Sequence, residues 1–88
     1  MSTRAVKKVR AILGARLRGL RGELGFTQRG LGRRAGLSGE FIGEVERGEK
    51  SITIDSLYLL SRALRTPLGD LASLDNHRPR ARRMPRAR

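Results

Sequence analysis

The apolar residues of the chain recur mainly at spacings of three and four, the pattern of a helix with one buried face. The first such run begins at Val9 and ends at Leu24, and Gly25 then offers a left-handed stop. Its apolar positions are Val9, Ile12, Leu13, Leu17, Leu20 and Leu24. A short second helix is predicted from Thr27 to about Ala35, because Thr27 is a favourable N-cap residue.

Three more helices are predicted after the second one. Ser38 is the expected cap of a helix that Gly48 ends, and Thr53 opens the next helix. Pro67 fits the first position of a last helix, with Thr66 as its cap. The apolar positions of these helices are Phe41, Ile42 and Val45, then Ile54, Leu57, Leu60, Ala63 and Leu64, then Leu68, Leu71 and Leu74. Because no segment of strand length alternates with period two, we expect an all-α fold of five short helices.

The two ends of the chain lack this pattern. Residues 1–8 read as a basic N-terminal arm that can extend the first helix, and residues 9–75 form the predicted helical domain. Residues 76–88, NHRPRARRMPRAR, contain two prolines and six arginines and have no apolar periodicity. We therefore expect a disordered basic C-terminal tail.

Charge is distributed unevenly along the chain, whose formal net charge is +12. Residues 1–38 carry a net charge of +9, residues 39–75 carry −3, and residues 76–88 carry +6. Seventeen of the twenty basic residues are arginines, whose guanidinium suits bidentate contacts with phosphate. Two basic ends around a mildly acidic middle indicate a polyanionic partner.

The composition argues against several other classes of protein. Cysteine is absent and the single histidine, His77, lies in the predicted tail, so neither a disulfide nor a metal site is expected. No apolar run is long enough to span a bilayer and no secretory segment is present, so we expect a soluble, cytoplasmic protein. An enzyme and a cofactor are not expected, because there is no Gly-rich phosphate loop and no clustered carboxylates.

A helix, a turn at Gly36 and a second helix have the outline of a helix-turn-helix. The segments LRGLR (17–21), GFTQ (25–28), GLS (36–38), ERG (46–48) and SLYLLSRAL (56–64) occur in one register. With these motifs, the chain from Leu13 to Leu71 resembles the lambda-repressor-like, XRE-type helix-turn-helix domain. Within that family, the segment ERGEKSITIDSL is similar to the controller proteins of restriction–modification operons.

The resemblance implies roles for individual residues. Gln28 would touch a phosphate, while Gly39, Glu40 and Glu44 would face base edges in the major groove. Arg21 and Glu46 would form a structural ion pair between the first helix and the end of the recognition helix, Ser38–Arg47. The expected DNA-binding residues are Thr27, Gln28, Arg29, Ser38, Gly39, Glu40, Phe41, Glu44, Arg47 and Lys50.

The acidic residues of the recognition helix leave two interpretations open. Glu40 and Glu44 are four residues apart and so share one helix face. A carboxylate on that face can accept a hydrogen bond from cytosine N4, or it can be merely solvated. Gly39 stands where many relatives carry a polar or basic reader, so specificity can rest on DNA shape. Non-specific phosphate contacts are expected from Arg33, Arg34, Arg78, Arg80, Arg82 and Arg83.

Glycines inside the predicted helices also have two interpretations. They are Gly14, Gly19, Gly22, Gly30, Gly32, Gly39 and Gly43. Each costs about 0.8–1 kcal/mol relative to alanine in a helix interior. The resemblance gives a packing reason for Gly32 alone, because the family has a small residue where the second helix crosses the third. The others reflect either compositional drift or a marginal monomer that dimerisation stabilises.

Taken together, the sequence predicts a DNA-binding transcriptional regulator that acts as a homodimer on a pseudo-palindromic operator. Leu68, Leu71 and Leu74 are the candidate dimer contacts, or they complete the core of the monomer, which we expect for Leu71 in particular. Control of its own gene would fit the similarity to controller proteins. The expected partners are double-stranded DNA at the nucleoid and a second copy of the chain, without membrane or metal. Two alternatives are a protein-interaction module such as an antitoxin, whose acidic helix binds a partner, and an RNA binder that uses the tail.

Overall fold

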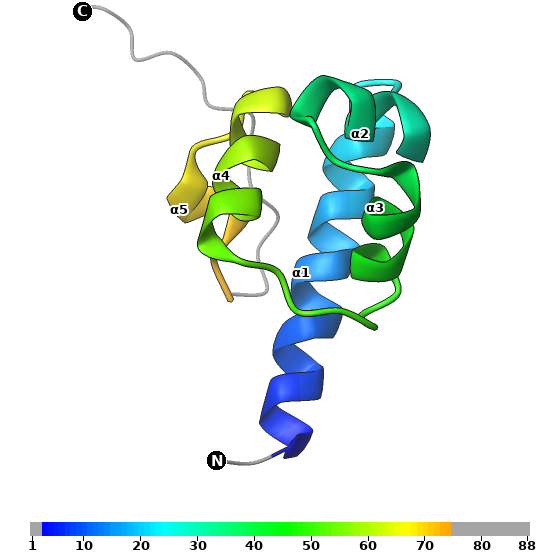
Figure 1. The fold of residues 1–88 in the computed structure, drawn as a ribbon. Helices are drawn as coiled ribbons and strands as arrows, with labels where there is room; N and C mark the ends of the chain where they lie inside the picture. Colours follow the sequence, from blue (N-terminus) through cyan, green and yellow to red (C-terminus); the bar gives the residue numbers. More distant parts are fainter. Residues whose placement is uncertain (1–2, 75–88) are drawn as a thin grey trace, which may run out of the picture.

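The computed structural model describes residues 3–74, which form five α-helices and no strand (Figure 1). The helices are α1 (Thr3–Glu23), α2 (Gln28–Ala35), α3 (Gly39–Glu46), α4 (Ile54–Ala63) and α5 (Leu68–Leu71). The predicted all-α fold of five helices is confirmed. The predicted tail, with Arg78, Arg80, Arg82 and Arg83, lies outside the described residues.

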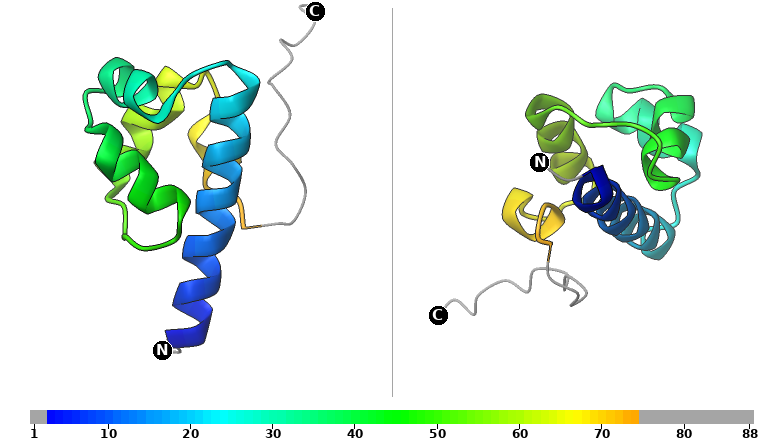
Figure 2. Two further views of the ribbon diagram at one scale, coloured as in Figure 1. Left: turned by 90° about the vertical axis from the view of Figure 1, so that its right-hand side faces the viewer. Right: turned by 90° about the horizontal axis from the view of Figure 1, so that it is seen from below.

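Helix α1 is the longest element and begins at Thr3, so residues 3–8 of the predicted arm are helical turns. Figures 1 and 2 show that the first part of α1 projects past the other helices. We call residues 3–10 the N-terminal extension of α1. The remainder of α1 packs against α3 on one side and α5 on the other.

Three helices begin as local sequence chemistry predicts. The side-chain oxygens of Thr27, Ser38 and Thr53 each accept a hydrogen bond from the backbone N–H three residues later, at 2.8–3.0 Å. These bonds satisfy amides that have no partner within the helix. The predicted N-caps of α2, α3 and α4 are therefore confirmed.

Helix α5 begins differently from the prediction. Thr66 is buried, and its hydroxyl donates to the carbonyl of Leu64 at 3.2 Å instead of capping a helix. Pro67 directly precedes α5 and makes no side-chain cap bond. The expected Thr66 cap is wrong, because the threonine hydroxyl is turned inward to satisfy a carbonyl at the end of α4.

Left-handed residues end three of the helical segments as predicted, and a fourth was not predicted. Gly25, Gly36 and Gly48 have φ values of 76–78°. Arg65, just after α4, also has a positive φ of 55° and is the only residue other than glycine to do so in the described part of the chain. A side chain with a Cβ costs roughly 1–2 kcal/mol in this conformation.

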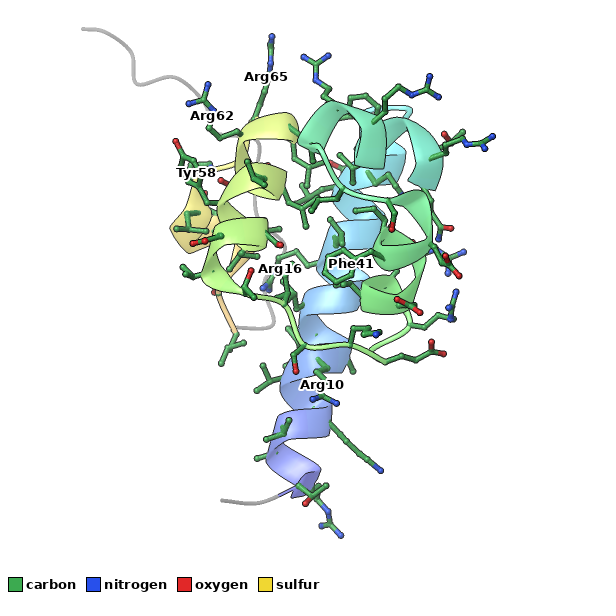
Figure 3. The ribbon with its side chains drawn as sticks, viewed as in Figure 1. Arg10, Arg16, Phe41, Tyr58, Arg62 and Arg65 are labelled. Carbon is green, nitrogen blue, oxygen red and sulfur yellow. The ribbon has the colours of Figure 1, made fainter. Side chains whose placement is uncertain are left out.

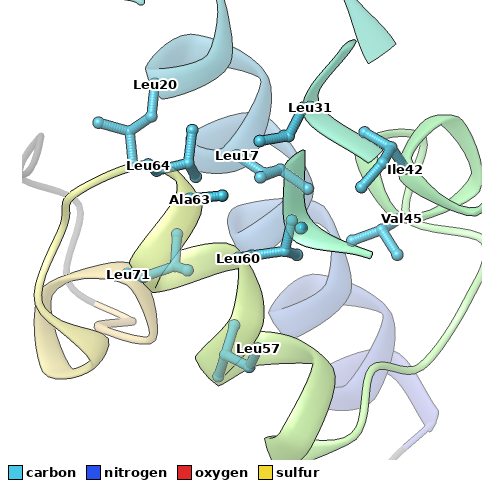
Figure 4. Packing of buried hydrophobic residues seen from close by; sticks show 11 residues of the cluster. Leu17, Leu20, Leu31, Ile42, Val45, Leu57, Leu60, Ala63, Leu64 and Leu71 are labelled. Atoms are coloured by element: carbon cyan, nitrogen blue, oxygen red, sulfur yellow. The ribbon is translucent and has the colours of Figure 1, made fainter. Parts of the chain in front are cut away.

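The core lies between α1 and the other four helices, as Figure 4 shows. Its buried members are Leu17, Leu20, Leu31, Ala35, Ile42, Val45, Leu57, Leu60, Ala63, Leu64 and Leu71. Leu71 is 0% exposed and completes the core, as the alternative interpretation expected, so it cannot also face a partner as a dimer contact. Leu68 packs partly buried against this core, whereas Leu74 is 53% exposed.

Candidate nucleic-acid interface

Helices α2 and α3 form a helix-turn-helix that is held against α1 (Figure 1). The turn passes through left-handed Gly36, and the Leu37 N–H donates to the Gly32 carbonyl at 2.7 Å. The Ser38 cap then starts α3 at once. This short connection leaves little freedom in the angle between the two helices.

Two glycines allow the backbone of neighbouring segments to approach closely. A Cβ on Gly14 of α1 would lie 2.5 Å from the Val45 carbonyl oxygen and 2.6 Å from that of Glu46, at the end of α3. A Cβ on Gly32 of α2 would lie 2.6 Å from the Leu37 carbonyl oxygen, which agrees with the packing reason expected for it. Because neither separation can be tolerated, both positions require glycine at the present spacing of the helices.

Gly39 is a third close contact and a correction to the expected site. A Cβ on Gly39 would lie 2.9 Å from Cα of Arg29 in α2. The side-chain direction of Gly39 is therefore toward α2, and not toward base edges as expected. No residue with a side chain fits there unless α3 moves away from α2.

An ion pair joins α1 to the end of α3. Arg21 of α1 donates through Nε to Glu46 Oε2 at 2.6 Å and through Nη2 to Oε1 at 3.1 Å. The Arg21 and Glu46 side chains are only 16% and 3% exposed. The hydrogen bond to Glu46 raises the pKa of Arg21 above its usual value. Arg21 also donates to the Phe26 carbonyl at 2.8 Å, which fixes the chain between α1 and α2.

Gln28 completes this cluster, which the sequence reasoning did not foresee. Its Nε2 donates to Glu46 Oε1 at 3.0 Å, so the side chain expected to touch a phosphate is anchored to α3. A Cβ on Gly43 would lie 3.1 Å from Gln28 Oε1 and 3.2 Å from Arg47 Nη1. The Gln28 and Arg47 side chains therefore converge over Gly43, in space that a larger residue would occupy.

The outward face of α3 is acidic. Glu40 is exposed and Glu44 is partly exposed, and no Lys or Arg lies between Gly39 and Glu46. Arg47, just after the helix, is exposed and donates to Glu49 at 2.9 and 3.1 Å. This hydrogen bond lowers the pKa of Glu49, so the pair is ionised at neutral pH. Any positive charge at the α3 surface must therefore come from flanking segments.

Several flanking bases are exposed on the elements around α3. They are Arg29, Arg33, Arg34, Arg47 and Lys50. The Arg34 guanidinium lies 5.8 Å from the ring centroid of Phe26, within the range of a cation–π contact. Arg10 of α1 donates to Ser51 Oγ at 2.9 Å beside Lys50, and so supports the loop after α3.

Three other expected site residues have structural roles in the domain. Phe41 lies between α1 and α3 and packs against the core, so it is turned away from the acidic face (Figure 3). The hydroxyl oxygens of Thr27 and Ser38 are occupied as helix caps. Arg62 of α4 and Arg65, just after the end of α4, are exposed bases that the prediction did not include.

The described part of the chain was compared with the requirements of a metal site and of a membrane-spanning helix. Residues 3–74 contain no group of three or more His, Cys, Asp or Glu side chains that could hold a metal ion. Over the same residues, no helix is both long and apolar enough to cross a bilayer.

Comparison with known proteins gives a consistent family. Residues 17–71 match the model of the helix-turn-helix family HTH_3. The chain is 36% identical over 56 residues to an uncharacterised HTH-type transcriptional regulator, y4dJ, of Sinorhizobium fredii. That match covers 64% of this chain and 73% of the relative.

Solved structures share both fold and sequence with the chain. The restriction–modification controller protein C.AhdI of Aeromonas hydrophila is 32% identical with a TM-score of 0.69, and the match covers 70% of this chain and 90% of C.AhdI. The P22 c2 repressor, solved in complex with a synthetic operator, is 33% identical with a TM-score of 0.68. That match covers 73% of this chain and 97% of the repressor.

Proposed function

Because the chain belongs to the HTH_3 helix-turn-helix family of XRE-type transcriptional regulators, we propose that it binds operator DNA sequence-specifically through α3. In this role α3 enters the major groove with Glu40 and Glu44 toward the base edges. Either carboxylate can accept a hydrogen bond from cytosine N4, so C·G pairs are the expected target. The solved operator complex of the P22 c2 repressor supports this mode of binding.

The observation that carries the proposal is the cluster around Glu46. One nearly buried carboxylate accepts hydrogen bonds from Arg21 of α1 and from Gln28 of α2. It therefore fixes α3 relative to both neighbours, and base readout requires such a preorganised helix.

Affinity is assigned to the bases that surround α3. Phosphate contacts position a protein on DNA and supply most of the salt dependence of binding. Arg29 and Lys50 flank α3 on opposite sides in the sequence and are exposed. We assign them to the two DNA backbones, with Arg33 and Arg34 as further phosphate contacts.

The proposed functional unit is a homodimer on a pseudo-palindromic operator. Two-fold dimers of this motif place their recognition helices about 34 Å apart, so that each reads one half-site. The similarity to a controller protein favours an operator upstream of the regulator's own gene.

The test is a fluorescence-anisotropy titration with DNA from upstream of the gene against a scrambled duplex, at several salt concentrations. The proposal expects a preference of at least about tenfold that persists at moderate salt, as base readout is worth about 1–3 kcal/mol per good contact. Glu44→Gln should reduce this preference. Glu23→Gln, which removes the same charge from the end of α1, should leave it unchanged.

Other outcomes would favour different functions. Equal affinity for both duplexes, falling steeply with salt, would mean that the arginines bind DNA without readout, and the acidic face of α3 would then suit a protein partner. Stronger competition by single-stranded or duplex RNA than by DNA would support an RNA binder.

A further inference from the structure

The N-terminal extension of α1 lies outside the part of the chain that the family model matches. That match begins at residue 17, whereas α1 begins at Thr3. Residues 3–10 contain Arg4, Lys7, Lys8 and Arg10 and no acidic residue. The extension is thus a basic helical segment added to a common domain, and the helix-turn-helix does not explain it.

An apolar stripe continues from the core onto this extension. Val6 and Val9 precede Leu13 by seven and four residues, and Leu17 follows it by four. Residues at these spacings share one helix face. Leu17 is 1% exposed, but Val6 and Val9 are 36% and 40% exposed. Figures 1 and 2 show no other described helix alongside the extension, so this molecule leaves the stripe uncovered.

A second apolar surface lies on the outer side of α4. Ile54 and Tyr58 are four residues apart and are 64% and 48% exposed. Asp55 and Leu59 form the adjacent row, in which Asp55 is exposed and Leu59 is 41% exposed. Figure 3 shows Tyr58 on the side of α4 away from α1 and α3. We call these four residues the outer face of α4.

We propose that the extension of one copy packs on the outer face of α4 in a second copy. The valines would cover Ile54 and Tyr58, and the bases of the extension would face Asp55. Charge complementarity at the first turn of α4 favours this occupant, because a segment with four bases and no acid meets the Asp55 carboxylate there. The exposed base Arg62, which donates to the Tyr58 hydroxyl at 3.3 Å, lies seven residues further along, at the other end of α4. This contact rests on the proposed homodimer. It places the dimer interface between the extension and the outer face of α4, and not at Leu68 and Leu74 around α5.

A two-fold axis makes this contact occur twice. In an isologous dimer, each copy both donates an extension and receives one. The extension projects past the first turn of its own α4 in Figure 1, and so it is placed to reach another molecule. The exposed valines of the extension and the exposed apolar residues of the outer face of α4 would then be covered.

The test measures dimerisation without DNA by sedimentation velocity over a range of concentrations. Val6→Ser/Val9→Ser should raise the dimer Kd about tenfold or more, because four half-exposed valines per dimer lose their apolar contact. Lys7→Glu/Lys8→Glu and Asp55→Lys should each weaken the dimer. Their combination should restore the Kd to within about threefold of wild type, since opposite charges face each other again.

Matched controls separate this contact from general charge effects. Arg33→Glu/Arg34→Glu makes the same change in net charge at the end of α2 and should leave the dimer Kd unchanged. All of these positions are exposed or partly exposed, so circular dichroism should show an intact fold in every variant.

Three results would overturn the inference. If the dimer Kd did not change in the valine and charge variants, the homodimer would form through another surface. A chain that stays monomeric at every concentration would remove both the contact and the dimer, while the preference for operator DNA is measured separately. Loss of DNA affinity in Lys7→Glu/Lys8→Glu with an unchanged dimer would make the extension a phosphate contact instead.

Discussion

In α1, Gly14 and the pair Gly19 and Gly22 occupy similar helical backbone in different surroundings. Gly14 lies against the last carbonyls of α3, where a Cβ would come within 2.5 Å of an oxygen. Gly19 and Gly22 have nothing within 4 Å of the place where a Cβ would stand. All three lower the intrinsic helix propensity of α1 equally, so the difference lies wholly in tertiary structure.

This difference divides the two interpretations of the helical glycines. Gly14, Gly32 and Gly39 are explained by close approach of backbones around α3, which the sequence anticipated for Gly32 alone. Gly19 and Gly22 have no structural reason, which agrees with compositional drift. Gly14, Gly32 and Gly39 thus bring backbone segments close together around α3, whereas Gly19 and Gly22 only weaken α1.

The largest effect should come from the second device that holds α3 to α1, the Arg21–Glu46 pair. Glu46→Ala should lower the free energy of unfolding by about 3–5 kcal/mol, because it leaves the largely buried Arg21 guanidinium without its carboxylate and removes the acceptor of Gln28. Urea denaturation followed by circular dichroism measures this loss. A loss below about 1 kcal/mol would show that the glycine contacts hold α3 without the pair.

Gly14→Ala should be the next most damaging change. The new Cβ meets backbone atoms that cannot rotate away, so we expect a loss of about 3 kcal/mol. In a domain of this size, that loss corresponds to a fall in Tm of roughly 12–24 °C. Gly19→Ala is the matched control on the same helix. Equal melting temperatures for the two variants would show that close approach of the α3 backbone does not require glycine at position 14.

Gly39→Ala tests the contact between α3 and α2. We expect a loss of about 2 kcal/mol, because α3 must shift away from the Arg29 backbone. We also expect weaker operator binding, since the shift moves the acidic face of α3. Measuring stability and anisotropy on the same sample separates the two effects. Unchanged operator affinity in a destabilised variant would mean that the position of α3 is not critical for readout.

Gly19→Ala and Gly22→Ala should act in the opposite direction. Each should raise the free energy of unfolding by about 0.5–1 kcal/mol, since alanine favours the helix and meets no neighbour. Their combination should be nearly additive in a thermal melt. If either change destabilised the domain, the new methyl group would have to clash with a neighbouring molecule, such as a second copy, because nothing in the monomer lies near it.

The smallest effect on stability is expected from Glu49→Gln, in the exposed pair with Arg47. The unfolding free energy should hardly change, but DNA affinity should rise and its salt dependence should steepen by about one phosphate contact, as Arg47 is released. The hydrogen bond from Arg47 lowers the pKa of Glu49 in the folded state. The ion pair is therefore fully present at any pH above the pKa of Glu49 in the unfolded chain, and it is lost as the pH falls through the lower pKa of the folded state. Wild type and variant should therefore converge in acid, which anisotropy titrations can follow.

Local features of the fold were predictable from sequence, whereas contacts between distant segments were not. Thr27, Ser38 and Thr53 cap helices because a cap depends on residues within one turn. Thr66 failed as a cap because its burial, which depends on the whole domain, redirected its hydroxyl. Gly14 gave one usable signal, since it lies next to the buried stripe formed by Leu13 and Leu17.

The candidate site was predictable to a similar extent. Family resemblance implied the Arg21–Glu46 pair, which the structure contains. The bond from Gln28 to Glu46 joins positions eighteen residues apart and had no local signal. Gly39 was expected at the base edges because the family resemblance implied it, and the sequence does not show that α2 passes within 2.9 Å of a Cβ at this position.

Arg65 is a position at which a single substitution could stabilise the domain. It adopts a left-handed conformation that glycine would accept without strain, at a position that ends α4. Every arginine codon is a single nucleotide change from a glycine codon. A lineage that acquires a damaging substitution elsewhere in the domain therefore has a nearby step that restores part of its stability. In a chain rich in both residues, exchange between arginine and glycine is an accessible way of adjusting the fold during evolution.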